Sequence, residues 1–140
     1  MVRMDNLDLF LLADDNGVVV DDFDLHQTPS IAMSDDDGQC YVAIDPAKLG
    51  TTADERAHLA HELGHCITGS FYNRHSKLDI RAKHERRANV WAIRQLVPLD
   101  KLRGCVKRGL REHWEIAEEF NVPPWFAARA MEYYHEGGLA

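Results

Sequence analysis

The spacing of apolar residues changes near residue 50, and the two parts of the chain predict different secondary structure. Before residue 50, the apolar runs are short, rich in β-branched residues and separated by Asp, Gly and Pro, a pattern typical of strands. These runs cover residues 18–25, 30–34 and 39–45. Between the last two, Asp35-Asp36-Asp37-Gly38 predicts a hairpin turn. The first fifty residues therefore predict a small antiparallel sheet of about three strands, preceded by a short helix within residues 2–13 and a turn at residues 14–17.

After residue 50, apolar residues recur three and four positions apart, as on one face of a helix. In the first such segment they form a narrow stripe that would let a helix pack closely, made of Ala53, Ala57, Ala60, Gly64 and Ile67. The sequence from Thr52 to Glu55 matches a capping box at the start of this helix, and Gly69 is a suitable end. A second helix is predicted over residues 80–97, where Pro98 ends it.

Three shorter amphipathic segments follow, over residues 99–106, 114–120 and 125–134. The last two have the helix, short turn, helix spacing of a DNA-reading motif. However, the second of them has Arg129 as its only basic residue, against Glu132 and Glu136, which argues against DNA binding. The pattern favours helices that pack over the preceding helices or grip a protein partner. We therefore expect an α+β core over residues 1–98 and a helical extension over residues 99–140 that packs on it.

Composition limits the classes of protein that fit. The chain has 140 residues, enough for one domain with a modest core, and no apolar run long enough to span a membrane. The N-terminal residues carry Asp where a signal peptide would be apolar, so we expect a cytoplasmic protein. Cys40, Cys66 and Cys105 are odd in number and widely spaced, without a C-x-x-C pair, and predict reduced, mostly buried thiols.

The net charge of −7 is unevenly distributed. Residues 1–50 contain eleven Asp, no Glu and two basic residues, for a charge of −9, whereas the rest of the chain carries +2. An acidic first part argues against nucleic acid as the main ligand. A basic protein partner would suit this surface, although a run of Asp is more often a solvated face.

The sequence His61-Glu62-Leu63-Gly64-His65 lies within the first predicted helix. Two His residues four positions apart rise from one face of a helix, where both imidazoles can bind one Zn2+. Glu62 projects about 100° further round the helix, where it can reach a water molecule rather than the metal. Protein ligands, an open coordination position and a carboxylate base are what a zinc hydrolase needs. A purely structural zinc site would not need Glu62.

A third ligand must come from elsewhere, because two imidazoles rarely hold catalytic zinc alone. The metzincin spacing is excluded, since Thr68 and Phe71 occupy the positions where that class has Gly and His. Glu85 on the second predicted helix can complete the metal shell, and Asn89, four residues later, can hydrogen-bond a ligand imidazole. Spacing alone leaves alternatives open, which are His75, Asp79 and His84. His58, one turn before His61, is a surface or supporting residue rather than a ligand.

The strand over residues 40–45 directly precedes the helix that carries these His residues. If it lay at the edge of the sheet, it could pair with an extended peptide and align the peptide main chain across the metal. The alternative is that this strand simply contributes to the core.

The runs TTADERAHLAHELGH and KHERRANVWAIRQLVP resemble the ImmA/IrrE family of metallo-endopeptidases, in particular its short phage and mobile-element members. In that family, the second helix has a Glu, then Ala with Asn or Asp, an aromatic residue with Ala, and a Leu-x-Pro ending. These features fall on Glu85, Ala88-Asn89, Trp91-Ala92 and Leu96-Val97-Pro98. The resemblance implies a zincin-like domain in which Glu85 is the third, gluzincin-like ligand.

The resemblance also implies a function, namely a zinc endopeptidase that cleaves a helix-turn-helix repressor and so relieves transcriptional repression. Glu62 would act as general base, and Tyr72, Arg74 and His75 in the loop between the two helices are candidates for stabilising the oxyanion. A site of two His and one Glu also accepts Mn2+. The alternative is a non-catalytic, zinc-containing module that sequesters a repressor or acts in a toxin-antitoxin pair. Both readings predict a protein partner, without direct contact to nucleic acid or membrane.

Overall fold

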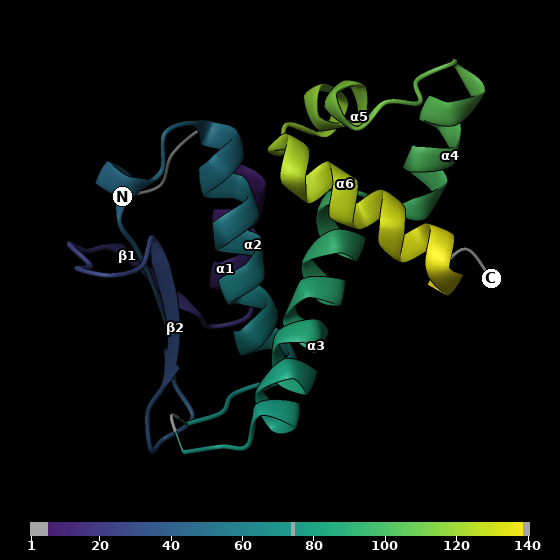
Figure 1. Ribbon diagram of the computed structural model, residues 1–140. Helices are drawn as coiled ribbons and strands as arrows, with labels where there is room; N and C mark the ends of the chain where they lie inside the picture. The colour runs from purple at the N-terminus through teal and green to yellow at the C-terminus, as the bar shows by residue number, and fades with distance from the viewer. Residues whose placement is uncertain (1–5, 74, 139–140) are drawn as a thin grey trace.

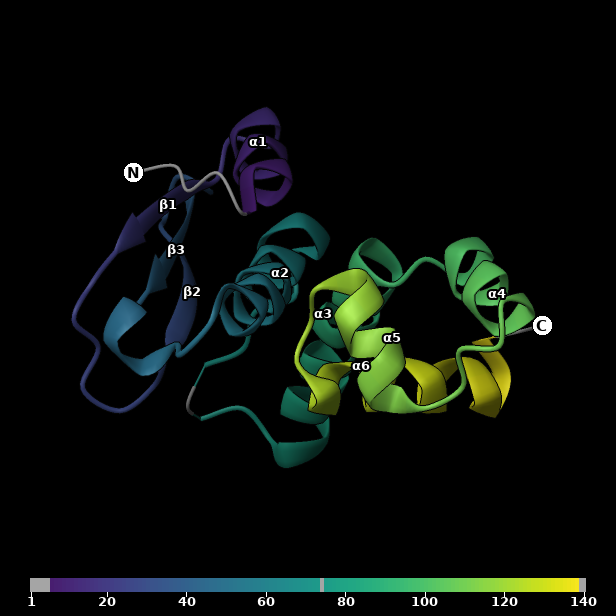
Figure 2. The ribbon, with the colours of Figure 1, turned by 90° about the horizontal axis from the view of Figure 1, so that it is seen from above.

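The computed structural model describes residues 6–73 and 75–138. Its elements, in chain order, are α1 (Leu7–Asp15), β1 (Val19–Asp22), β2 (Ser30–Ser34), β3 (Cys40–Ile44), the 3₁₀ turn η2 (Pro46–Lys48), α2 (Thr52–Thr68), α3 (Leu78–Leu96), α4 (Leu99–Lys107), α5 (His113–Phe120), α6 (Pro124–Tyr133) and the π-helical turn η3 (Tyr134–Gly138). In Figures 1 and 2, α2 lies between the sheet on one side and α3 to α6 on the other. The predicted α+β class, with three strands before the helices, is confirmed.

The three strands form a mixed sheet in the order β1-β3-β2. The predicted hairpin is confirmed, since β2 and β3 pair antiparallel and Ser34 lies opposite Cys40. The prediction of a wholly antiparallel sheet is wrong for β1, which pairs parallel to β3 with Val19 opposite Tyr41. The reason is that residues 23–29 carry the chain past β3 to the far edge before it reverses. Asp45, buried at the end of β3, anchors this crossing by accepting a 3.0 Å hydrogen bond from the Leu25 amide.

Helix α2 has the expected stop but a different start. Gly69 ends it in the left-handed conformation, with φ of 67°, as the sequence predicts. The N-cap, however, is Thr51 rather than Thr52, and its side chain accepts a 3.0 Å bond from the Asp54 amide. Glu55 is buried and faces α1 instead, where its carboxylate accepts a 3.1 Å bond from Asn6. The capping-box prediction is therefore wrong because tertiary contact with α1 takes the Glu55 side chain.

The small-residue stripe of α2 lets α3 approach closely. A Cβ built on Gly64 would lie 2.6 Å from the carbonyl oxygen of Ala88, well inside van der Waals contact. Ala57 and Ala60 on the same helix are fully buried. This close contact sets the distance between the helix that carries His61 and His65 and the helix that carries Glu85.

One hydrophobic cluster runs from α1 and the sheet through α2 and α3 into the C-terminal helices. Its fully buried members include Leu9, Ile44 and Leu63 from the first part of the chain and Ile116 and Ala130 from the last. The C-terminal helices thus pack on the preceding ones, and Tyr134 donates a 2.7 Å hydrogen bond to the carbonyl of Val97. The division of the chain after residue 98 stays a prediction.

Cys40 of β3 and Cys66 of α2 form a disulfide, with their Cα atoms 5.9 Å apart. The prediction of reduced thiols is therefore wrong for these two, whereas Cys105 is free and buried as expected. The two cysteines are 26 residues apart, and no sequence pattern predicts that they pair, because only the packing of α2 on the sheet brings them together. Among residues 6–73 and 75–138, no helix is long and apolar enough to cross a membrane.

Candidate metal centre

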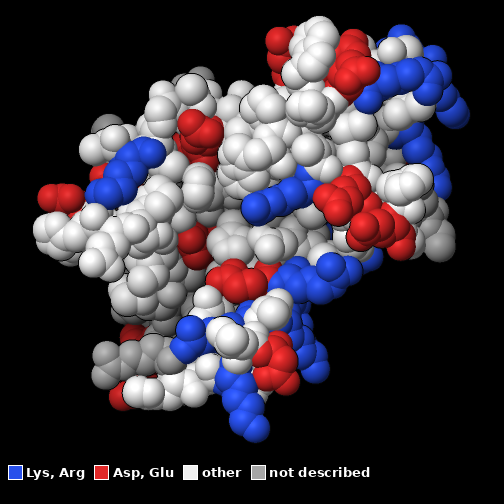
Figure 3. All heavy atoms as spheres, in the orientation of Figure 1, with Lys and Arg blue, Asp and Glu red and all other residues white. Residues whose placement is uncertain are grey.

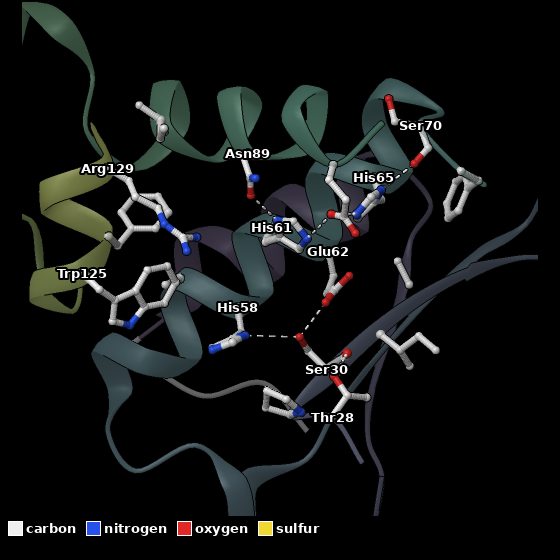
Figure 4. Close-up of a pocket in the computed structure, with 18 of the residues that line it drawn as sticks. Thr28, Ser30, His58, His61, Glu62, His65, Ser70, Asn89, Trp125 and Arg129 are labelled. Carbon is white, nitrogen blue, oxygen red and sulfur yellow. Dashed lines mark hydrogen bonds and ion pairs between the residues drawn. The ribbon is translucent and has the colours of Figure 1, made fainter. Parts of the chain in front are cut away.

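Three side chains from α2 and α3 converge at one point. The Nε2 atoms of His61 and His65 each lie 3.0 Å from Oε2 of Glu85. One ligand atom from each of the three residues lies within 4.8 Å of the others. Figure 4 shows the two imidazoles of α2 pointing toward α3, beside the Glu62 carboxylate. The four-residue spacing on α2 and the close approach of α3 at Gly64 together produce this arrangement.

The other nitrogen of each imidazole is held by a hydrogen bond. His61 Nδ1 lies 2.7 Å from Oδ1 of Asn89, and His65 Nδ1 lies 2.5 Å from the Ser70 carbonyl oxygen. Both acceptors favour a proton on Nδ1, so a neutral imidazole turns its Nε2 lone pair toward the Glu85 carboxylate. Positive charge, either protons on the imidazoles or a metal ion, stabilises such a group of lone pairs beside a carboxylate. The donor set therefore fits a divalent metal ion held by His61, His65 and Glu85.

The same contacts shift the ionisation of these groups. Hydrogen bonds from His61 and then His65 hold the pKa of Glu85 far below its usual range. Burial lowers the pKa of His65, but hydrogen bonds to Glu85 and to the Ser70 carbonyl outweigh it, so the net shift is upward. Tyr72 donates a 2.7 Å hydrogen bond to Oε1 of Glu85, which raises the Tyr72 pKa to about 12 and keeps this hydroxyl protonated.

Glu62 points away from Glu85, toward the sheet. It is buried, with 7% of its surface exposed, and its Oε2 accepts a 2.6 Å hydrogen bond from the hydroxyl of Ser30, the first residue of β2. Nδ1 of His58 lies 3.5 Å from the same hydroxyl. Burial, and then the neighbouring His61, lowers the pKa of His58. Glu62 is thus an oriented carboxylate beside the three ligand atoms rather than one of them.

These residues line one pocket of about 670 Å3. Residues 28–32 of β2 and the preceding loop form one wall, whereas Trp125, Phe126 and Arg129 of α6 form another. The face in Figure 3 is hollowed between these parts, with acidic atoms inside the hollow.

Residues 40–45 cannot pair with a substrate peptide as an edge strand, because β3 is central, so that expectation is wrong; β2 is the edge strand that borders the pocket. The reason is the crossing of residues 23–29, which places β1 on the other side of β3.

The structure brings together five of the predicted site residues, which are His61, Glu62, His65, Glu85 and Asn89. Tyr72 also lines the pocket. His75 is not among the residues that line it, and its backbone amide donates a 2.8 Å hydrogen bond to the Asn73 side chain. Its role as an oxyanion donor stays a prediction. The third candidate, Arg74, lies outside the described residues.

Sequence reasoning missed several residues of the pocket, among them Ser30, Ser70 and Trp125. Ser30 and Ser70 lie in segments whose position depends on packing, so no spacing rule points to them. Trp125 begins the second helix of the apparent helix-turn-helix. Its aromatic ring lies 5.9 Å from the ring of His58 on α2. The two residues are far apart in the sequence, so no spacing along the chain relates them.

The comparisons with known proteins agree with this geometry. Residues 13–132 match the IrrE N-terminal-like domain, a peptidase family. The curated proteins and the solved structures give no match to the chain. Because the matched region covers most of the 140 residues, the protein belongs to the IrrE N-terminal-like domain family of metallopeptidases.

Proposed function

We propose that the protein is a zinc-dependent endopeptidase in which Glu62 is the general base. The observation that carries this proposal is the position of Glu62, whose buried carboxylate lies in the same pocket as the convergent donors of His61, His65 and Glu85. A site that only stabilised the fold would close around its metal and would not need a carboxylate beside it. This is the feature that favours an enzyme over the non-catalytic module.

When bound, zinc acts as a Lewis acid and lowers the pKa of a water molecule toward about 7. Glu62 takes a proton from the attacking water and passes it to the leaving amine. Ser30 holds the Glu62 carboxylate in place through its 2.6 Å hydrogen bond. Tyr72, which lines the pocket and whose hydroxyl stays protonated, is one candidate donor to the oxyanion, beside His75 and Arg74.

The free edge of β2 gives an extended peptide a place to bind. Residues 28–32 border the pocket, and Ile31 is partly exposed there. A substrate main chain that pairs with this edge would pass in front of the three ligand atoms. As substrate we propose a helix-turn-helix repressor in the cytoplasm, on the basis of the resemblance to the ImmA/IrrE family.

The test is to incubate the zinc-loaded protein with the repressor encoded beside its gene and to read fragments by intact mass. We expect the parent to cut at one bond, and Glu62→Gln to bind zinc but leave the repressor whole. Glu118→Gln, which makes the same change on the exposed face of α5, is the matched control and should cleave like the parent. Stable binding without fragments from the parent would instead support the sequestering module, and normal cleavage by Glu62→Gln would exclude Glu62 as the base.

A further inference from the structure

We propose that Arg129 and Trp125 form a subsite for an acidic side chain of the substrate, beside the metal centre. This inference rests on the proposed function and adds a substrate preference to it. Both residues belong to α6, and both line the pocket that contains His61 and Glu62. Helix α6 thus contributes a binding surface to the site as well as packing against α3.

The aromatic ring orients the guanidinium. Cζ of Arg129 lies 4.9 Å from the centroid of the Trp125 ring, within the range of a cation-π contact. Residues four positions apart on a helix face the same side, so α6 itself sets this contact. A cation-π contact does not use up the N–H groups of the guanidinium, which can donate to both oxygens of one carboxylate.

Among the described residues, no ion pair gives Arg129 an anionic partner. Over residues 6–73 and 75–138, ion pairs join Arg56 to Asp8 and Arg108 to Glu119, but none involves Arg129. Glu132, three positions further along α6, lines a second cavity together with Arg129, but over the described part of the chain no ion pair joins the two. A guanidinium that is oriented but unpaired fits a carboxylate supplied from outside.

Charge within the pocket determines where that carboxylate can bind. Of the described residues that line the pocket, Arg129 is the only Lys or Arg, whereas Glu62 and Glu85 contribute negative charge at the ligand cluster. Figure 4 shows Arg129 and Trp125 on the His58 side of the pocket, away from Ser70. A bound Zn2+ would balance the charge of the two glutamates, so Arg129 would be the cationic side chain left to bind an acidic residue of the substrate at its end of the pocket. Trp125, with 42% of its surface exposed, offers an apolar face for the methylene groups of that residue.

The test uses peptide hydroxamates, which bind the metal without being cleaved. One series would extend the peptide to the N-terminal side of the hydroxamate and the other to the C-terminal side, with acetylated or amidated ends. Each series would carry Asp, Asn or Lys at each of the first three positions. Affinity for the zinc-loaded protein is measured by calorimetry. We expect the peptide with Asp to bind about tenfold more tightly than the peptide with Asn at one position. A tenfold ratio corresponds to the free energy that a hydrogen bond to a charged group contributes. A further arm with a free C-terminal carboxylate separates recognition of a chain end from recognition of a side chain.

The variants decide whether Arg129 is responsible. Arg129→Gln should abolish the preference for Asp, Arg129→Glu should replace it with a preference for Lys, and Trp125→Ala should weaken it. Arg111→Gln removes an exposed charge outside the pocket and should keep the preference. Equal binding of Asp and Asn by the parent, a gain only from a free C-terminus, or an Asp preference that survives in Arg129→Gln would each overturn the proposal. Hydroxamate binding does not require cleavage, so the two proposals can fail separately. If the protein prefers Asp but cleaves no substrate, the proposed function is overturned and the subsite is not. If the parent binds no hydroxamate, both proposals are overturned.

Discussion

The hydroxyl of Ser30 donates a 2.6 Å hydrogen bond to Oε2 of Glu62. Both residues are buried, with 6% and 7% of their surfaces exposed, and they are 32 residues apart in the chain. The contact joins the first residue of the edge strand to the proposed general base. The strand that would bind the substrate therefore also orients the carboxylate that would act on it.

We expect Ser30→Ala to lower kcat about tenfold, with little change in KM or zinc content, because removing a supporting hydrogen bond misplaces the base without removing a ligand. Steady-state kinetics on the cleaved substrate, together with the zinc content of the purified protein, check this. Ser34→Ala changes the exposed end of the same strand and serves as control. An unchanged kcat in Ser30→Ala would mean that Glu62 is oriented without this hydroxyl.

The candidate ligand positions on α2 were predictable, because two His residues four apart face one way on any helix. The partners of these residues were predictable only in part. Asn89 follows Glu85 by one turn, so helical spacing was enough to relate them. Ser30 and Ser70 reach the site through the path of a loop and a turn, which local patterns do not determine. The parallel pairing of β1 and the Cys40–Cys66 disulfide were missed for the same reason.

Because His61 hydrogen-bonds Asn89, replacing Asn89 should change the affinity for the metal. Without Asn89 Oδ1, the His61 imidazole loses both its orientation and its preferred tautomer. We expect Asn89→Ala to weaken zinc binding about 10- to 100-fold, as measured by competition with a chromogenic chelator. Gln95→Ala on the exposed face of α3 is the control and should bind zinc like the parent. Equal affinity in Asn89→Ala would exclude a supporting role for this amide.

The Cys40–Cys66 disulfide can be tested by counting free thiols and by measuring how much the bond stabilises the protein. Titration of the denatured, unreduced protein should find one free thiol per chain, that of Cys105. Because the bond closes a loop across 26 residues, its loss should lower the free energy of unfolding by about 3.5 kcal/mol. Urea unfolding of the Cys40→Ser/Cys66→Ser double variant measures this. Three free thiols in the parent would show that the bond is absent in solution.

Removal of the metal should change how stability depends on pH. In the metal-free protein, the raised pKa of His65 stabilises the fold below the ordinary value of 6.5, and this contribution is lost as the pH rises through the folded pKa. The lowered pKa of Glu85 stabilises the fold above 4.5 and is lost as the pH falls. Zinc binds the deprotonated imidazoles, so its contribution increases with pH. We expect the Tm gain on adding zinc to grow between about pH 5.5 and 7.5. A gain that shrank over this range would contradict imidazole ligands.

The close approach of α2 and α3 can be tested at Gly64. A Cβ there would lie 2.6 Å from the Ala88 carbonyl and 3.1 Å from its Cα, so the rigid backbone of α3 would have to move. Such overpacking costs about 1–3 kcal/mol or more.

The matched control is Gly104→Ala in α4, where no atom lies within 4 Å of the added Cβ. This change should raise stability by about 0.5–1 kcal/mol, through the higher helix propensity of Ala. Urea unfolding of both variants gives the two values, and chelator competition gives their zinc affinities. We expect Gly64→Ala to lose zinc affinity as well as stability, because a wider gap between α2 and α3 moves Glu85 away from His61 and His65. Loss of stability with unchanged zinc affinity would show that the distance between the ligands does not depend on this contact.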